Sequence, residues 1–151
     1  MTISEATIHS GVQDAIQALS EFASASVIVN DYSVYDDPVS NAPYVLIENS
    51  DEFETRQDTS VQTTAWSIKL TLIEAFTDWT TTLNSFRTNR QALIDMVTGN
   101  TWAFGTSEGF DTTSLSSAGP IIPFYDSYED EPAESLPTFI QQEMTLSTEE
   151  F

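Results

Sequence analysis

The sequence predicts an α+β fold, a two-layer sandwich in which two α-helices cover a mixed or antiparallel β-sheet. Two segments carry apolar residues at helical spacing, and several shorter segments alternate apolar with polar residues, many of them β-branched. The 151 residues are 40% apolar and include three Trp, five Tyr and nine Phe, enough to build a core without disulfides or metal. We therefore expect a single domain over residues 1–151, with long loops at about 49–61 and 105–135.

The N-terminal segment is predicted to form an amphipathic helix. Thr2 and Glu5 have the spacing of a capping box, which satisfies backbone N–H groups at a helix start. A stripe of apolar residues at helical spacing follows, so one face of this helix is expected to be buried. The stripe consists of Ile8, Val12, Ala15, Ile16, Leu19 and Phe22.

Two strands are expected next, separated by an irregular acidic stretch. "SVIV" is a short β-branched strand, and Pro38 and Pro43 interrupt the chain after it. "YVLIEN" is then a strand buried on both faces or nearly so. Residues 49–61 are polar and lack apolar periodicity, so they are predicted to be a long hairpin connection.

The following strand, "AWSIKLTLIEAF", contains the only lysine of the chain. Successive side chains of a strand point to opposite faces, so Lys69 is expected on the outward or interface face of a central strand. The predicted inward residues are Trp66, Ile68, Leu70 and Leu72, and the outward ones are Ser67, Lys69 and Thr71.

A second helix and two further strands complete the predicted fold. Asp78 is placed to cap this helix and Gly99 to end it, while Arg87 and Arg90 flank its apolar stripe. "TWAFGTSEGFDTT" is read as a strand entering a turn, and an irregular acidic excursion with three prolines precedes the last strand. The helix stripe is Trp79, Leu83, Phe86, Leu93, Ile94 and Val97; the last strand has Ile140, Met144 and Leu146 inward and Phe139, Gln141 and Glu143 outward.

The charge of the chain restricts its partners. Twenty-four acids and four cations give a formal charge of -20, which repels phosphate backbones and anionic lipid surfaces. The acids run from Glu5 to Glu150 rather than forming a tail, so we expect them to cover a folded surface. Such a composition is typical of proteins from salt-loving archaea and their viruses, because at molar salt the Debye length falls to about 3 Å. An ordinary acidic mesophilic protein is the alternative.

The residue types that usually catalyse reactions form no recognisable motif in this sequence. There is no cysteine, and the one histidine, His9, lies in the first helix without a nucleophile motif, so we expect a solvated or core-edge side chain. Carboxylate pairs occur throughout and none singles out acid–base chemistry. We expect no catalysis and no cofactor. Residues 126–134, which are rich in carboxylates, are a candidate for binding a hard cation, although the EF-hand spacing is missing.

Membrane and nucleic-acid contacts are not expected. No apolar run approaches the ~20 residues that cross a bilayer, and residues 1–20 lack the features of a secretory signal. The aromatic groups "DYSVY" and "PFYDSY" contain no Lys or Arg, so they do not fit a platform for stacking nucleic-acid bases. They fit either a loop-anchoring core or a subunit interface.

The element order, with one short motif, resembles the tail terminator (tail completion) proteins of long-tailed phages and archaeal tailed viruses. The motif is "VYDDP" at residues 34–38 followed by "PYV" at residues 43–45, at the entry to a strand. The likeness extends over nearly the whole chain, although residues 105–135 are longer than in compact members of the family.

This resemblance implies a structural protein that assembles as a hexameric ring on the end of the tail tube. Its expected partners are further copies of itself, the tail tube protein and a head–tail connector or stopper protein. Its expected location is the neck of the virion, after assembly in the host cytoplasm. DNA would pass through an acidic lumen without specific binding, because no attractive phosphate contacts would retard it.

A ring needs contacts between subunits, and two kinds of residue are candidates. The few cations can meet a neighbour's acids, and large groups on polar segments can form an exposed apolar surface. The predicted interface residues are Phe53, Arg56, Lys69, Arg87, Arg90, Phe124, Tyr125 and Tyr128.

Two alternatives to a tail terminator are open. A head–tail adaptor or stopper of the same neck has a similar size. A metal-dependent enzyme would use paired carboxylates, and it would need a concave pocket that joins acids distant in the sequence.

Overall fold

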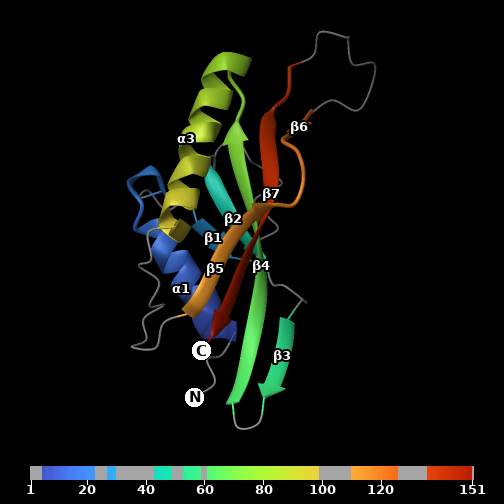
Figure 1. The fold of residues 1–151 in the computed structure, drawn as a ribbon. Coiled ribbons are helices and arrows are strands. Elements are labelled where there is room, and N and C mark those ends of the chain that lie inside the picture. The colour runs from blue at the N-terminus through green and yellow to red at the C-terminus, as the bar shows by residue number, and fades with distance from the viewer. Residues whose placement is uncertain are drawn as a thin grey trace.

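The computed structural model describes residues 5–22, 27–29, 43–48, 53–58, 61–98, 110–125 and 136–150. These residues form helices, a short 3-10 turn and strands that join in one sheet (Figure 1). In chain order the elements are α1 (Glu5–Gln17), η1 (Ser20–Phe22), β1 (Val27–Val29), β2 (Tyr44–Glu48), β3 (Phe53–Asp58), β4 (Val61–Ala75), α3 (Trp79–Thr98), β5 (Phe110–Ser117), β6 (Ile122–Phe124) and β7 (Phe139–Glu150).

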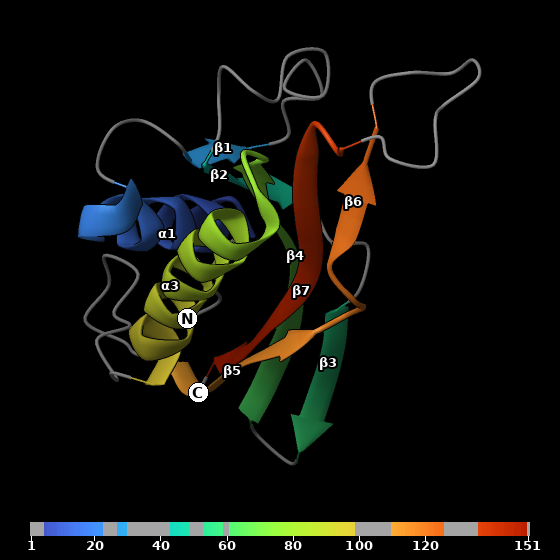
Figure 2. The same ribbon diagram turned by 90° about the horizontal axis from the view of Figure 1, so that it is seen from above.

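The sheet is mixed, and α1 and α3 lie on the same face of it (Figure 2). Its main path runs β1-β2-β4-β7-β5, with β3 paired to β4 and β6 paired to β7 outside this path. Only β1 and β2 are parallel among the described pairs, and the long strand β4 is central. The predicted two-layer α+β sandwich is therefore confirmed.

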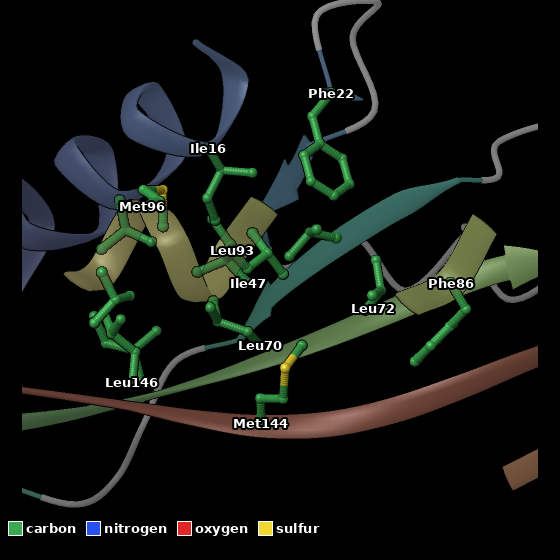
Figure 3. Packing of buried hydrophobic residues seen from close by; sticks show 14 of the residues in the cluster. Ile16, Phe22, Ile47, Leu70, Leu72, Phe86, Leu93, Met96, Met144 and Leu146 are labelled. Atoms are coloured by element: carbon green, nitrogen blue, oxygen red, sulfur yellow. The ribbon is translucent and has the colours of Figure 1, made fainter. Parts of the chain in front are cut away.

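The main core lies between the two helices and the sheet (Figure 3). Val12 and Ile16 of α1 are fully buried, as their helical spacing predicts. In β4 the alternation is also as predicted, since Ile68, Leu70 and Leu72 are buried against the helices. Residues of η1, β2, α3 and β7 complete this core: Phe22, Val45, Ile47, Phe86, Leu93, Met96, Val97, Ile140, Met144 and Leu146.

A second, smaller cluster is buried on the opposite face of the sheet. It consists of Tyr44, Leu46, Ile73 and Phe139. Strand β2 is therefore buried on both faces, as its continuous apolar run predicts. Phe139 and Gln141 are corrections, because the alternation of β7 predicts both outward, whereas each is only 8% exposed.

The start of α3 has the predicted cap. Asp78 Oδ1 accepts a hydrogen bond of 2.8 Å from the backbone N–H of Thr81. The hydrogen bonds from Thr81 hold the pKa of the Asp78 carboxyl below its usual value. A second hydrogen bond fixes the chain ahead of α3 to the helix, because Thr82 Oγ1 accepts from the backbone N–H of Thr77 at 3.0 Å.

The buried stripe of α3 differs from the predicted one. Trp79 and Ile94 were expected inward but are 44% and 37% exposed. Ile94 is about 100° around the helix from the buried Leu93, and Trp79 packs edge-on against Phe76 with ring centroids 4.9 Å apart. Polar residues take part in the stripe instead, namely Thr82 and Asn89, which are nearly fully buried.

The two predicted long loops contain strands. Phe53–Asp58 forms β3 within residues 49–61, and β5 and β6 lie within residues 105–135. Thr55 and Gln57 of β3 are exposed, so the backbone pairing with β4 defines this strand without any apolar alternation. The start of the strand predicted from residue 101, and the helix signals at Thr2 and Gly99, lie outside the described residues.

Candidate functional site

Lys69 lies on the face of the sheet opposite to the helices, between two acids on the neighbouring strands. Its Nζ is 3.2 Å from Glu48 Oε2 on β2 and 2.9 Å from Glu143 Oε1 on β7. The hydrogen bond to Glu143, with the nearby charge of Glu48, raises the pKa of the Lys69 ammonium above its usual value despite partial burial. The outward position predicted for Lys69 is confirmed, and the ion pairs connect three adjacent strands.

These ion pairs remove the reason for which Lys69 was predicted to be an interface residue. The expectation was that a scarce cation is used where it meets acids of a neighbouring subunit. Both partners of Lys69 belong to its own chain, although 40% of its side chain is exposed. Its role in a subunit contact stays a prediction.

Next to Lys69 on β4, Thr71 has a buried hydroxyl group. The residue is 1% exposed, and its Oγ1 forms no hydrogen bond with any described residue. A buried polar atom without a partner carries its full desolvation cost. The position is therefore suboptimal for stability on the face that carries Lys69.

We expect Thr71→Val to raise the free energy of unfolding by about 1 kcal/mol, because it replaces this hydroxyl with a methyl group of similar size. Thr82→Val is the matched control, since Thr82 is equally buried but accepts a hydrogen bond, and it should cost about 1 kcal/mol. Urea unfolding at one fixed KCl concentration measures both. Equal losses in the two variants would contradict the interpretation.

Most of the exposed large apolar residues belong to segments at one end of the sheet, where β4 ends, α3 and β7 begin and β6 lies (Figure 1). We call this surface the apolar end, and it consists of Trp79, Ile122, Phe124, Tyr125 and Leu136, which are 37% to 63% exposed.

Backbone and ring contacts hold the segments of the apolar end together. The backbone N–H of Phe76, ahead of α3, donates to the carbonyl of Thr138 at 3.0 Å. The N–H of Thr138 in turn donates to the carbonyl of Phe124 at 2.7 Å. The ring of Phe124 stacks on that of Phe139, with centroids 4.8 Å apart. The apolar end is thus a fixed surface formed by three separate segments of the chain.

The predicted interface residues Phe124 and Tyr125 both belong to the apolar end. The alternation in the sequence did not identify Trp79, Ile122 and Leu136 as part of it. The only signal for them was their position beside prolines or at an element boundary, where apolar side chains extend beyond the buried faces.

A polar layer lies between α3 and the sheet close to this end. Glu74 of β4 points toward α3 and is only 6% exposed. Its carboxylate accepts hydrogen bonds from the Ser85 hydroxyl and, at 2.9 Å, from Asn89 Nδ2. Burial raises the pKa of the Glu74 carboxyl, and these two hydrogen bonds partly oppose the shift. No ion pair to Glu74 occurs among the described residues.

Arg90 continues this polar layer toward β6. Its Nη1 donates to Gln142 Oε1 at 2.9 Å, and Gln142 Nε2 donates to the carbonyl of Gly119 at 3.0 Å. The guanidinium also lies 5.8 Å from the centroid of the Phe86 ring. Helix α3, strand β7 and the turn before β6 are thereby connected. Arg90 was predicted to reach an acid or a neighbouring subunit, and in the described chain it bonds an amide.

Arg87 lies in a shallow surface hollow of about 390 Å³ between η1 and α3. The hollow also contains two acids, Glu21 and Asp95, so its charge is mixed. Arg87 forms no ion pair with any residue that the structure describes. Among the predicted interface cations whose side chains are described, Arg87 is the exposed one that has no ion pair with another described residue.

The remaining predicted residues are not described at the level of side chains. Phe53 and Arg56 belong to β3, whose backbone alone is described at these two positions. Tyr128 and the candidate cation-binding segment 126–134 lie outside the described residues. Within the described ranges, no group of three or more His, Asp or Glu residues is arranged to hold a metal ion. His9 is buried at 7% exposure, at the edge of the α1 stripe, as expected.

Neither of the two described helices has the length and apolar character needed to cross a membrane. No model of a known protein family matches this sequence, and no curated protein is significantly similar to it.

Proposed function

We propose that this protein is a ring-forming structural subunit of a viral head–tail neck, a tail terminator that caps the tail tube and joins it to the head connector. The resemblance in element order and in the motif at residues 34–45 suggests this role. The two-layer α+β fold agrees with the fold that this resemblance implies. The acidic composition suits a virus whose host lives at high salt.

The observation that supports assembly most strongly is the hairpin formed by β3 and the first part of β4. Pairing of β4 with β7 begins only at Ala65, so Val61–Thr64 pair with β3 alone among the described strands. The hairpin therefore projects beyond the rest of the sheet (Figure 1). An isolated two-stranded hairpin is marginally stable in water. Contact with a neighbouring subunit would stabilise it.

The hairpin and the apolar end lie at opposite ends of the molecule (Figure 1). Two unlike contact surfaces on one protomer suit heterologous association, which closes into a ring when the rotation between subunits is right. Arg56 is the only cation of the hairpin, and in this proposal it meets acids of the next subunit and helps to set the register. A ring built from so acidic a chain has an acidic lumen, through which DNA passes without binding.

The test is the mass of the purified protein in dilute buffer and in multimolar KCl, measured by light scattering together with circular dichroism. We expect a folded hexamer, or an equilibrium with it, at high salt, where the Debye length is about 3 Å or less. Arg56→Glu should shift this equilibrium toward the monomer without loss of secondary structure. Gln57→Glu, on the neighbouring exposed position of β3, is the control and should assemble normally.

A folded monomer at both salt concentrations, also in the presence of tail tube protein, would contradict the proposal. A ring that binds the portal side and not the tube end would instead identify a head–tail adaptor or stopper. This second role has the same fold and the same location in the neck.

A further inference from the structure

Strand β5 lies at one edge of the sheet, where it pairs with β7 and with no other described strand. Backbone groups of such a strand point alternately to its partner and to the outer edge. The N–H of Ala118, directly after β5, donates to the carbonyl of Glu143 on β7 at 2.9 Å. Even-numbered residues of β5 therefore face β7, and Thr113, Leu115 and Ser117 direct their N–H and carbonyl groups outward. We call this row of outward groups the β5 edge.

The β5 edge lacks the features that usually prevent an edge strand from pairing with another chain, which are shortness, charged side chains and proline. Each of the other described edge strands has one of them. β1 has only three residues, β3 includes Glu54, Arg56 and Asp58, and β6 has Pro123 at its centre. β5 has eight residues, and beyond the register shift at its start, residues 112–117 contain neither charge nor proline. Such an edge is a template for an added strand.

The segment that forms this edge is neutral, although the protein is strongly acidic. Residues 112–125 contain no charged residue, and no other uncharged run of the chain is as long. Ser114, Ser116 and Ser117 are exposed, whereas Leu115 is half-buried and packs against the main core. The strand is therefore accessible, and it carries no charge that would repel a second acidic chain or select a cationic partner.

We propose that two copies of this chain associate along the β5 edge, with their β5 strands antiparallel and related by a two-fold axis at Leu115. In this register Leu115 lies opposite its counterpart, and Thr113 lies opposite Ser117 of the second copy. All three outward residues then pair, which gives ~6 backbone hydrogen bonds and joins the two sheets into one. An edge that is complementary to itself suits the isologous contact of a two-fold dimer.

The charge of the protein favours this position for a contact between copies. Two molecules that each carry a formal charge of -20 repel each other, and they do so least where neither surface is charged. The contact spans residues 113–117, far fewer than the ~20 residues a side of a standard interface, so the dimer forms reversibly. β5 belongs neither to the hairpin nor to the apolar end, so the inference does not depend on the proposed ring.

The absence of cysteine from the chain allows a direct test by disulfide cross-linking. In the proposed register, Ser114 of one copy lies opposite Ser116 of the other. The two Cα atoms would be ~4.5 Å apart, within the range that a disulfide spans. Identical positions of the two copies would lie diagonally, ~7 to 8 Å apart, which is outside that range.

Ser114→Cys and Ser116→Cys proteins are mixed under mild oxidation in multimolar KCl, where repulsion between copies is screened. Non-reducing electrophoresis and mass spectrometry follow the cross-linked species. We expect the mixed disulfide to form about tenfold faster than either variant cross-links alone. Ser10→Cys, at an exposed serine of α1, is the matched control. Mixed with the Ser116→Cys protein, it should cross-link only at the slow rate of random collision.

A proline at the end of β5 tests the role of the backbone. Ser117→Pro removes an outward N–H and keeps the pairing with β7, because that N–H points away from β7. Introduced into both cysteine variants, it should slow the mixed cross-link about tenfold. Circular dichroism and the reaction of the thiols with a small reagent should be unchanged. Arg56→Glu, which should weaken the proposed ring, should leave the mixed cross-link intact.

Equal rates for the mixed pair and the single variants would overturn the inference, as would equal rates with and without Ser117→Pro. Loss of the mixed cross-link in the Arg56→Glu background would also overturn it, because the β5 contact would then belong to the ring. If a ring forms without preferential cross-linking, the proposed function stands and this inference fails. If the mixed disulfide forms preferentially and no ring is found, the inference stands and the proposed function fails.

Discussion

Lys69→Glu is expected to lower the free energy of unfolding by about 2 to 3 kcal/mol, which corresponds to a fall in Tm of roughly 5 to 10 °C for a domain of this size. The substitution places three carboxylates on adjacent strands, at positions 48, 69 and 143, where the native chain has a cation between two acids. Like charges on neighbouring strands repel, and no other cation lies beside these groups in the described residues. Thermal unfolding followed by circular dichroism measures the change.

Lys69→Met is the control that separates charge from packing. It keeps the aliphatic stem over the sheet and removes only the ammonium, so we expect a loss of about 1 kcal/mol, since the side chain is 40% exposed and the pairs are screened. In molar KCl the difference between the Met and Glu variants should shrink, because repulsion between carboxylates is screened. A Glu variant as stable as the unchanged protein in dilute buffer would show that these ion pairs do not hold β2, β4 and β7 together.

The ion pairs of Lys69 also predict a pH limit. The pKa of Lys69 is raised in the folded state, so its contribution to stability is complete below the usual value of 10.5. That contribution is lost as the pH rises through the raised pKa. The Met variant should not show this alkaline loss.

Glu74→Ala is the second substitution with a large expected effect, a loss of about 2 kcal/mol or more at acidic pH, where the contribution of Glu74 is complete. It removes the acceptor of the buried Asn89 amide and leaves a small cavity between β4 and α3. Glu74→Gln keeps an oxygen that can accept from Asn89, and it removes a buried carboxylate that no cation neutralises within the described chain. We expect the Gln variant to be at least as stable as the unchanged protein at pH 7.

The unchanged protein and the Glu74→Gln variant should differ in how their stability depends on pH. Burial raises the pKa of Glu74 in the folded state, so the folded protein holds this proton more tightly than the unfolded chain does. The contribution of Glu74 is therefore complete below its ordinary value of 4.5 and is lost as the pH rises through the raised pKa. The Gln variant lacks this loss.

Urea unfolding between pH 4 and pH 8 at constant KCl measures the difference between the two proteins, and the many other carboxylates cancel in it. A Gln variant that loses stability in parallel with the unchanged protein would contradict the assignment to Glu74.

These two residues show different uses of charge in an acidic chain. Lys69 offsets acids on the open face of the sheet. Glu74 is an acid in the layer between sheet and helix, and no cation among the described residues pairs with it. Ser85 and Asn89 of α3 supply neutral donors for it instead. The position of α3 on the sheet therefore depends on a carboxylate as well as on apolar packing.

The sequence by itself determined the features that depend on local periodicity. Helical spacing predicted both helices and most of their buried faces, although the first was expected to continue to Phe22 and ends at Gln17. Alternation in β4 predicted that Lys69 points away from the core. These predictions hold because side-chain direction follows from backbone geometry, and burial of one face follows from the hydrophobic effect. The cap at Asp78 was likewise local in the sequence.

Only the tertiary structure decided which segments become neighbours. The partners of Lys69 come from β2 and β7, the donors to Glu74 come from α3, and the apolar end joins three separate segments. Strands β3, β5 and β6 are polar or contain proline, so their sequences lack the alternation of apolar and polar residues that identifies a strand. Their pairing with β4 and β7 is what defines them as strands. Strand pairing is a long-range property of the backbone, and it brings together residues whose local sequence carries no sign of one another.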